Sequence, residues 1–220
     1  MNKTLSIVTP LHKRTKREYI ARMNDDKIAC MKVAREYGYD FWDGSRRHGY
    51  GGYKYDGRWS VVAEKLIETY SLPDDAKILD IGCGKGFLLY EFTKLLPKAQ
   101  LAGFDISEYA IENAIDGVKP LLFQRSAEEE LPYEDKDFDL VISITTLHNL
   151  TIGKLDLALR EMERVGKNKY FVVESFRTER ELFNLQSWAL TCEIFLRPEG
   201  WAWLCEKARY SGEYEFIYFE

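Results

Sequence analysis

The feature that most constrains the fold of this 220-residue chain is a short apolar segment running directly into three closely spaced glycines. The segment is Ile78-Leu-Asp-Ile-Gly-Cys-Gly-Lys-Gly86, and we predict a helix at 86–96 directly after it. Glycines allow a tight turn with positive φ and leave no side chain between the backbone and a ligand. A strand, glycine turn and helix in this order are typical of parallel α/β sheets, which bind ligands outside the carboxyl ends of their strands.

The chain beyond residue 76 alternates apolar strands with helices. We predict strands at 77–81, 100–105, 120–124, 139–143 and 169–175, and helices at 107–115 and 153–165. Further helices are predicted at 179–185 and 198–209 and a final strand at 213–219, whereas 187–196 is ambiguous. Apolar strands separated by helices indicate a mostly parallel sheet covered on both faces. The prediction is a doubly wound α/β core over residues 61–220.

Residues 1–60 form a separate N-terminal segment in this interpretation. A helix is predicted at 16–37, a glycine- and aromatic-rich stretch follows at 37–59, and a helix is predicted at 60–70. The basic cluster His12-Lys-Arg-Thr-Lys-Arg17 is suited to an anionic ligand or nucleic acid, or else to a solvated face or a segment docked on the acidic part of the chain. Because the whole chain has a net charge of −5, we favour the last two interpretations and expect no nucleic-acid partner.

Composition excludes several other classes. No apolar run approaches the roughly 18 residues that cross a membrane, and residues 1–10 are too weak for a secretion signal. The four cysteines lie far apart without a Cys-x-x-Cys pair, so reduced thiols and a cytoplasmic location are expected. No cluster has convincing metal-ligand spacing, and we predict no metal.

The glycine spacing separates two kinds of nucleotide site. A dinucleotide site needs Gly-x-Gly-x-x-Gly, whereas here the third glycine comes one residue earlier and Asp80 precedes the first by two. A carboxylate there would repel a pyrophosphate and attract an ammonium group. The segment resembles the first motif of class I S-adenosylmethionine-dependent methyltransferases. That resemblance implies S-adenosylmethionine as cofactor, a Rossmann-like sheet with an antiparallel C-terminal strand, and contacts to the methionine moiety from Asp80, Gly82, Cys83, Gly84 and Gly86.

Later segments fit the same family. Asp105 ends the second strand, where the resemblance implies an acid that accepts both ribose hydroxyls, with Ile106 beside it. The family usually has Gly-Asp-Ala before its fourth strand, but this chain has Arg125-Ser126-Ala127. The adenine would then be read by Ser126, the Ala127 amide or Glu128. The exit of the fourth strand, Ser143 to Leu150, also resembles the family, which places Ser143 near the cofactor and His148 near the transferred methyl group.

The stretch 37–59 is predicted to be a lid over the pocket. It would present Tyr50, Tyr53, Tyr55 and Trp59, since aromatic faces attract a sulfonium as they attract other cations. Arg58 or Arg47 would hold the cofactor carboxylate or an anionic group of the substrate. His148 is the leading candidate for a catalytic base and Tyr53 a weaker one, because both side chains can exchange a proton. Glu174 either faces the pocket or pairs with an arginine.

The sequence therefore predicts a methyltransferase that acts on an oxygen or nitrogen of a small polar metabolite, with anionic and sugar-like compounds as candidates. The chain lacks the Asn/Asp-Pro-Pro-Tyr and Pro-Cys motifs of nucleic-acid and glutamine methyltransferases. Three alternatives stay open: an aminopropyltransferase-like enzyme, a non-catalytic cofactor-binding protein, and a nicotinamide oxidoreductase, which the glycine spacing disfavours. The sequence does not specify the acceptor or the oligomeric state.

Overall fold

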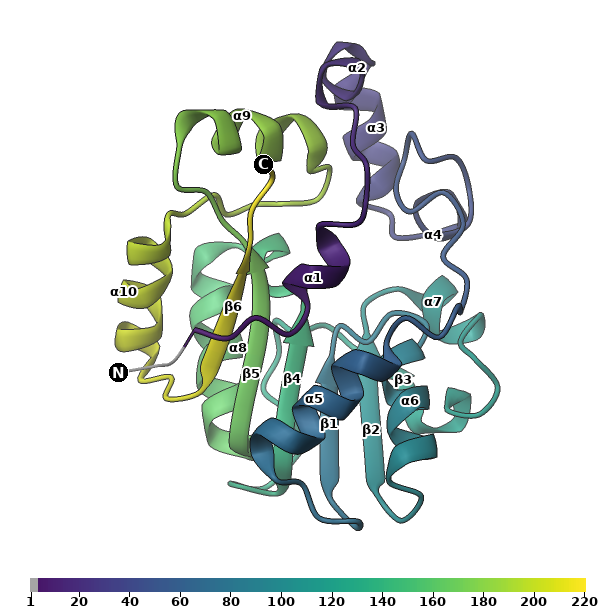
Figure 1. The fold of residues 1–220 in the computed structure, drawn as a ribbon, viewed down its shortest axis with the longest axis vertical. Coiled ribbons are helices and arrows are strands. Elements are labelled where there is room, and N and C mark those ends of the chain that lie inside the picture. Colours follow the sequence, from purple (N-terminus) through teal and green to yellow (C-terminus); the bar gives the residue numbers. More distant parts are fainter. Residues whose placement is uncertain (1–3) are drawn as a thin grey trace.

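A six-stranded parallel sheet forms the centre of the protein in a computed structural model that describes residues 4–220 (Figure 1). Its strand order is β3-β2-β1-β4-β5-β6. This is the order of a doubly wound nucleotide-binding sheet, so the predicted fold class is confirmed. The strands are β1 Lys77–Ile81, β2 Gln100–Asp105, β3 Leu122–Gln124, β4 Phe138–Ile144, β5 Gly166–Glu174 and β6 Glu213–Ile217.

The predicted antiparallel C-terminal strand is wrong. Strand β6 pairs with β5 in parallel, with Tyr170 opposite Glu213 and Glu174 opposite Ile217. The cause lies in the connection, because α9 (Glu179–Trp188) and α10 (Pro198–Ala208) carry the chain from the carboxyl end of β5 back to its amino end. A crossover of this kind returns a strand in the same direction as the one it left.

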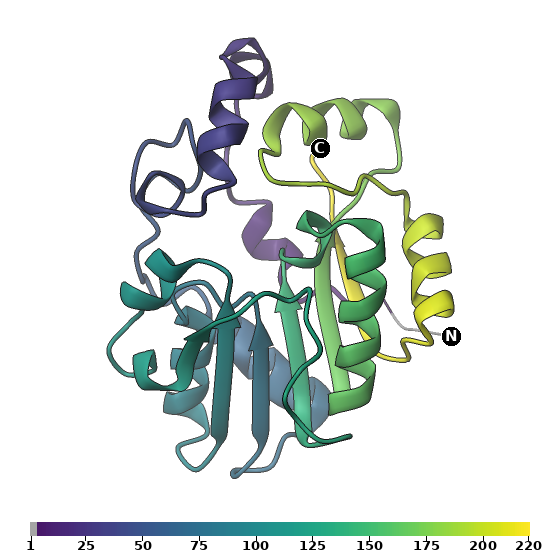
Figure 2. The same cartoon turned by 180° about the vertical axis from the view of Figure 1, so that it is seen from behind.

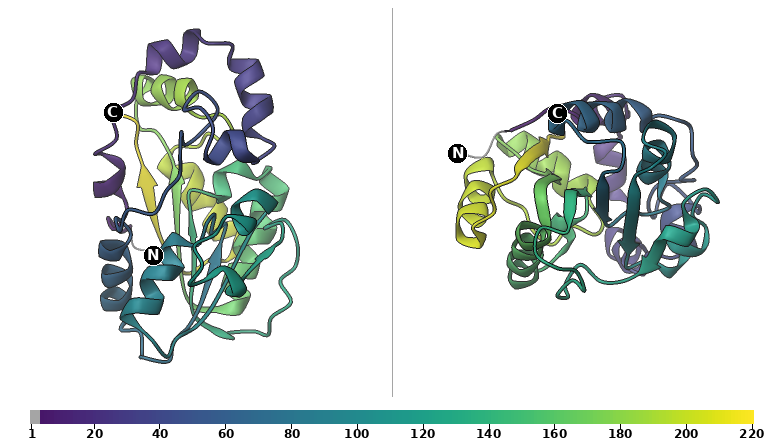
Figure 3. Two further views of the ribbon diagram at one scale, coloured as in Figure 1. Left: turned by 90° about the vertical axis from the view of Figure 1, so that its right-hand side faces the viewer. Right: turned by 90° about the horizontal axis from the view of Figure 1, so that it is seen from below.

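Helices cover both faces of the sheet (Figures 2 and 3). On one face α5 (Ser60–Tyr70) and α6 (Phe87–Leu95) pack over β1, and on the other α8 (Ile152–Val165) and α10 cover β4 and β5. Successive residues of β1 point to opposite faces, so Ile78 joins the first core and Leu79 the second. The short helix α7 (Glu108–Glu112) follows β2, and two 3-10 turns lie at Lys119–Leu121 and Leu147–Asn149. No helix among residues 4–220 is long and apolar enough to span a bilayer.

The N-terminal segment and α9 form a cap above the carboxyl ends of the strands (Figure 1). The segment contains α1 (Thr9–His12), α2 (Tyr19–Asn24), α3 (Lys27–Ala34) and α4 (Tyr39–Trp42), and α2 packs against α9. The single helix predicted at 16–37 is therefore wrong. The chain breaks at Asp25 and Asp26, because the Asp26 side chain accepts a hydrogen bond from the Ala29 amide (3.0 Å) and starts α3 as its N-cap.

A buried carboxylate attaches the cap to the sheet. Glu215 of β6 is fully buried and accepts hydrogen bonds from the backbone amides of Ile7 (2.6 Å), Val8 (3.0 Å) and Thr9. The Tyr170 hydroxyl donates to the same carboxylate. These charge-assisted bonds hold the start of the cap across the sheet edge.

We predict that Glu215→Gln lowers the free energy of unfolding by about 2–4 kcal/mol, since a neutral amide accepts less strongly and turns an N–H group toward other donors. Urea denaturation measures this change. The control is Glu206→Gln, at an exposed position of α10, which we expect to stay within about 0.5 kcal/mol of the wild type. Equal effects of the two substitutions would show that Glu215 does not anchor the cap.

Candidate functional site

Two adjoining cavities lie between the carboxyl edge of the sheet and the cap. The smaller has a volume of about 270 Å³ and the larger about 580 Å³. Both lie outside the carboxyl ends of the strands, where open α/β sheets bind their ligands. Their common wall includes Trp42, Tyr50, Gly82, Thr145 and Asn149.

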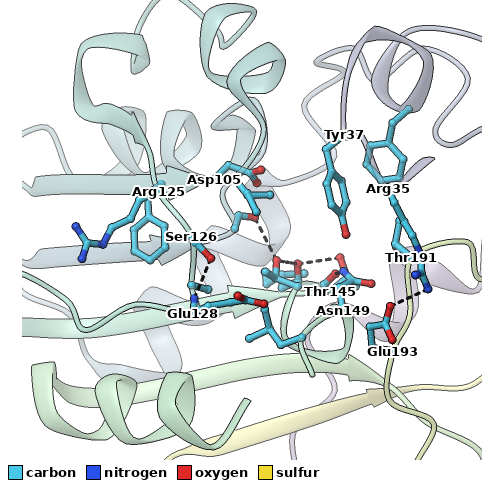
Figure 4. Close-up of a pocket in the computed structure, with 18 of the residues that line it drawn as sticks. Arg35, Tyr37, Asp105, Arg125, Ser126, Glu128, Thr145, Asn149, Thr191 and Glu193 are labelled. Carbon is cyan, nitrogen blue, oxygen red and sulfur yellow. Dashed lines mark hydrogen bonds and ion pairs between the residues drawn. The ribbon is translucent and has the colours of Figure 1, made fainter. Parts of the chain in front are cut away.

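The smaller cavity is formed by the core on one side and the cap on the other (Figure 4). The core contributes Asp105, Ile106, Ser126, Ala127 and Glu128, which are the residues that the sequence analysis assigned to ribose and adenine. The cap contributes Arg35 and Tyr37, the segment after α9 contributes Thr191 and Glu193, and an ion pair of 2.7 Å joins Arg35 to Glu193. Tyr37 belongs to the predicted lid stretch, whereas Arg35, Thr191 and Glu193 were not predicted, because the cavity joins two segments far apart in the sequence.

Asp105 is buried at the end of β2 and keeps part of its hydrogen-bonding capacity. Its Oδ2 accepts from the Gly84 amide (2.8 Å) and its Oδ1 from the Ser107 amide (2.9 Å). Each carboxylate oxygen has a second lone pair, so both can still accept from a ligand. Burial raises the pKa of Asp105, although the backbone hydrogen bonds oppose that shift.

The loop after β3 forms the floor of the same cavity. The Ser126 hydroxyl accepts a hydrogen bond from the Glu128 amide (3.1 Å), which fixes the turn through Ala127. Ile106 lines the cavity and is 52% exposed, so its side chain is available to an apolar ligand.

The glycine turn approaches its neighbours too closely for side chains. Gly82 has φ +77°, and a Cβ atom there would lie 2.0 Å from Oγ1 of Thr146. Gly84 has φ +53°, and its Cβ would lie 2.8 Å from the ring of Trp42 in the cap. Gly86 packs on Val118 in the same way and starts α6. Gly82 and Gly84 therefore bring the backbone turn, the exit of β4 and the cap together at the wall of the cavities.

The larger cavity contains the buried acid that precedes this turn. Asp80 is 4% exposed, and burial followed by the charge of Asp105 raises its pKa to about 8. It has no ion-pair partner within residues 4–220. Cys83 lines the cavity beside it, and burial raises the pKa of its thiol. Ser143 is different, because it is fully buried, donates to the Ile81 carbonyl (2.9 Å) and reaches neither cavity.

Aromatic rings of the stretch 37–59 form the upper wall. Tyr50 stacks on Trp42 with ring centroids 5.2 Å apart, and Tyr53 stacks on Phe87 of α6 at 4.9 Å. Trp59 also lines the larger cavity. Tyr55, a predicted lid residue, lines neither cavity, and its hydroxyl donates to the buried carboxylate of Glu91 in α6 (2.7 Å).

A buried ion pair connects this stretch to the glycine turn. Lys85 donates to Asp43 (2.5 Å) and to the carbonyl of Tyr53 (3.1 Å), and the Tyr109 hydroxyl donates to the same carboxylate (2.8 Å). Burial raises the pKa of Asp43, but the hydrogen bonds from Lys85 and Tyr109 outweigh it and lower the pKa overall. The cap is therefore joined directly to the ligand-binding turn.

Two arginines predicted to hold a cofactor carboxylate already have partners. Arg58 lines the larger cavity but pairs with Asp56, with Nε 2.7 Å from Oδ2. Arg47 pairs with Asp25 (2.6 Å) and reaches neither cavity. Three other arginines, Arg17, Arg22 and Arg46, line the larger cavity instead. Of these, the sequence analysis noted only Arg17, as part of the basic cluster.

His148 and Glu174 lie side by side in the larger cavity. Nδ1 of His148 accepts from the Glu174 amide (3.3 Å), and Nε2 lies 3.7 Å from the Glu174 carboxylate. Burial lowers the pKa of His148 to about 3. Burial raises the pKa of Glu174 to about 7, against the opposing charge of Arg17. Glu174 thus faces the cavity, one of the two positions left open by the sequence. The described residues contain no group of His, Cys, Asp and Glu suited to a metal.

Comparison with known proteins identifies the family. A family model described as a methyltransferase domain matches residues 72–213, more than half of the chain. The mouse protein "Arginine-hydroxylase NDUFAF5, mitochondrial" is 34% identical over 116 residues, covering 52% of this chain and 33% of its own length. A malonyl-[acyl-carrier protein] O-methyltransferase of Anoxybacillus flavithermus is 29% identical over 171 residues, covering 72% and 65%. The chain spans about a third of the length of the mouse relative.

Solved structures share the fold. A SAM-dependent methyltransferase from Archaeoglobus fulgidus has a TM-score of 0.54 and 24% identity, with 69% of each chain covered. The complex between the Haloferax volcanii Trm112 methyltransferase activator and a putative methyltransferase gives a TM-score of 0.56 and 17% identity, with 84% of this chain and 76% of the other covered. At these identities the likeness concerns the arrangement of the sheet and helices.

We predict that Gly82→Ala lowers the free energy of unfolding by about 2 kcal/mol or more, because the new Cβ must displace Thr146 and the backbone keeps a positive φ. Chemical denaturation measures the loss. Gly153→Ala in α8 is the matched control, since a Cβ there meets nothing within 4 Å, and we expect it to be neutral or stabilising by up to about 1 kcal/mol. If both variants were as stable as the wild type, the close approach at Gly82 would be refuted.

Proposed function

We propose that this chain, which belongs to the methyltransferase-domain family, is an S-adenosylmethionine-dependent methyltransferase that methylates an oxygen or nitrogen atom of a small polar metabolite. The observation that carries the proposal is the pair of joined cavities at the carboxyl edge of the sheet. The smaller one suits the adenosine of the cofactor. The larger one has room for the methionine moiety and an acceptor.

The described residues fit the cofactor at three points. Asp105 keeps free lone pairs for the two ribose hydroxyls. Ile106 and the turn Ser126–Glu128 provide apolar and polar contacts for adenine. Asp80 is a buried acid without a cation, and a ligand ammonium would compensate its burial. We assign the methionine end of the cofactor to Asp80 and the Gly82–Gly86 turn on this ground.

Bound S-adenosylmethionine supplies an electrophilic methyl group on a sulfonium. The protein contributes alignment of the acceptor and exclusion of water, which together lower the barrier without a metal. Trp42, Tyr50 and Tyr53 place ring faces along the larger cavity, where they favour a cationic group. The Lys85–Asp43 pair keeps this aromatic wall against the glycine turn.

Glu174 is better placed than His148 to accept a proton from the acceptor. Nδ1 of His148 is occupied by a backbone amide, so the neutral ring carries its proton on Nε2 and has no free lone pair. Tyr53 is also unsuited, since burial raises its pKa and its hydroxyl is hydrogen-bonded to Trp59. Glu174 has a pKa of about 7, the range in which a base is most effective. We therefore move the proposed base from His148 to Glu174, with His148 as the positioning residue.

The relatives indicate how broad the acceptor class is. One set is named for O-methylation of malonyl-[acyl-carrier protein] and another for arginine hydroxylation. Neither name concerns aminopropyl transfer, so we keep methyl transfer as the proposed reaction. The O-methyltransferase name supports an oxygen acceptor, whereas the hydroxylase name concerns a different reaction, so the nitrogen acceptor rests on the sequence prediction alone.

The cofactor assignment is tested by calorimetry with S-adenosylhomocysteine, S-adenosylmethionine and NAD. We expect the first two to bind and NAD not to bind. Asp105→Ala should weaken S-adenosylhomocysteine binding at least tenfold, because two hydrogen bonds to a charged group are lost. Glu206→Gln again serves as the control. An unchanged dissociation constant in Asp105→Ala would contradict the ribose assignment.

The raised pKa of Glu174 predicts a pH-dependent difference in stability. The folded protein keeps this carboxyl protonated up to about pH 7, whereas the unfolded chain ionises it near pH 4.3. The contribution of Glu174 to stability is therefore fully present below about pH 4.3 and is lost as the pH rises from there through 7. Glu174→Gln removes this loss. Relative to the wild type, the variant should gain about 2 kcal/mol between pH 5.5 and 7.5 in urea denaturation. A difference that does not vary with pH would place the pKa of Glu174 in the ordinary range.

A further inference from the structure

Three arginines converge on one indole ring in the larger cavity. The guanidinium carbons of Arg17, Arg22 and Arg46 lie 5.6, 5.0 and 5.0 Å from the ring centroid of Trp188 in α9. They come from the segment before α2, from α2 itself and from the loop after α4. All three line the larger cavity together with Glu174.

Each of these guanidinium groups is fixed on one side and free on the other. Nη1 of Arg17 donates to the Thr15 carbonyl (2.9 Å), Nη1 of Arg22 to the Arg46 carbonyl (3.0 Å), and Nη1 of Arg46 to the Gly49 carbonyl (3.0 Å). The Nη2 groups of all three find no acceptor among residues 4–220, and the buried Nε of Arg17 has no partner either. The guanidinium groups are therefore held in place by their Nη1 hydrogen bonds, while their Nη2 groups remain available to a ligand.

The three positive charges have no carboxylate partner. No Asp or Glu oxygen of the described part of the chain lies within 4.0 Å of these guanidinium groups. Three other arginines of the N-terminal segment differ, because Arg35 pairs with Glu193, Arg47 with Asp25 and Arg58 with Asp56. Burial lowers the pKa of Arg17, and the charge of Arg46 acts in the same direction, against the opposing charges of Tyr19 and Glu174. A bound anion would compensate the repulsion among these three positive charges and the cost of their burial.

We propose that Arg17, Arg22 and Arg46 bind a phosphoryl group of the methyl acceptor, so that the substrate of this enzyme is a small phosphorylated metabolite. The inference rests on the proposed function, because it places the acceptor in the larger cavity with its reacting atom toward Glu174. Three guanidinium groups offer paired donors to the several oxygens of a phosphate. A single carboxylate would neutralise one charge and leave two unpaired.

The cofactor carboxylate is the competing occupant of this cluster. It needs one cation, and Arg58 and Lys16 also line the cavity. The two occupants give different results when an arginine is removed. Loss of a cofactor contact weakens S-adenosylhomocysteine binding, whereas loss of an acceptor contact weakens phosphate binding to the complex that the enzyme forms with S-adenosylhomocysteine.

The test is calorimetric titration of the full chain with inorganic phosphate, diphosphate and malonate in phosphate-free buffer, with and without saturating S-adenosylhomocysteine. The variants are Arg46→Gln and Arg17→Gln, and the matched control is Arg47→Gln, whose side chain pairs with Asp25 outside the cavity. We expect phosphate or diphosphate to bind the wild type and Arg47→Gln, and to bind each cluster variant at least tenfold more weakly. Malonate should bind more weakly than phosphate, and S-adenosylhomocysteine affinity should change less than threefold.

Thermal melting separates binding from folding. Removing one of three repelling charges should not lower the melting temperature in phosphate-free buffer, and phosphate should raise it for the wild type but not for Arg46→Gln. Absence of phosphate binding to the wild type would overturn the proposal, as would tighter binding of malonate. A fall in S-adenosylhomocysteine affinity in the cluster variants with phosphate affinity unchanged would assign the cluster to the cofactor. Failure of S-adenosylhomocysteine to bind the wild type would refute the proposed function instead, and phosphate binding would still be measurable.

Discussion

Close contact between a bare backbone turn and its surroundings is the constraint on which this site depends. Only hydrogen atoms at Gly82 and Gly84 let Thr146 from the core and Trp42 from the cap approach the same loop. The Lys85–Asp43 ion pair then fixes the cap over that loop at a distance of 2.5 Å. Because the turn, the exit of β4 and the cap share this contact, the two cavities have a common wall and a ligand can extend from one into the other.

Charge is distributed unevenly along these joined cavities. Acids lie at the carboxyl ends of the strands, where Asp80, Asp105 and Glu174 belong to the last residues of three different strands, and each has its pKa raised by burial. Arginines come from the cap and meet around Trp188. A ligand with a cationic centre near the sheet and an anionic group near the cap would be complementary to both regions. This separation of charge is the physical basis for placing the cofactor next to the sheet and the acceptor next to the cap.

Much of the core could be predicted because its signals are local. The strands at 77–81 and 100–105 have the predicted bounds, and the helix at 60–70 does too, since each depends on its own run of apolar residues. The direction of β6 was not local, because it depends on how two helices return the chain across the sheet. The single N-terminal helix failed at Asp25 and Asp26, whose side chains compete with the helix for backbone amides.

The site likewise combines features that depend on local sequence with features that depend on contacts across the fold. The glycine turn and Asp105 carry spacing that a sequence displays directly, whereas the convergence of Arg17, Arg22 and Arg46 on Trp188 joins positions far apart in the chain. The position of the proton on the His148 ring likewise depends on the Glu174 amide, a backbone group that no residue pattern identifies. Properties set by contact across the fold therefore had to come from the structure.

The most direct measurement of this account is a crystal structure of the full chain with S-adenosylhomocysteine bound. The account predicts adenosine in the smaller cavity with both ribose hydroxyls on Asp105, the amino group at Asp80, and the sulfur atom opening toward Glu174 and the larger cavity. A nucleoside bound elsewhere, a glycine turn without ligand, or a sulfur atom turned away from Glu174 would contradict it.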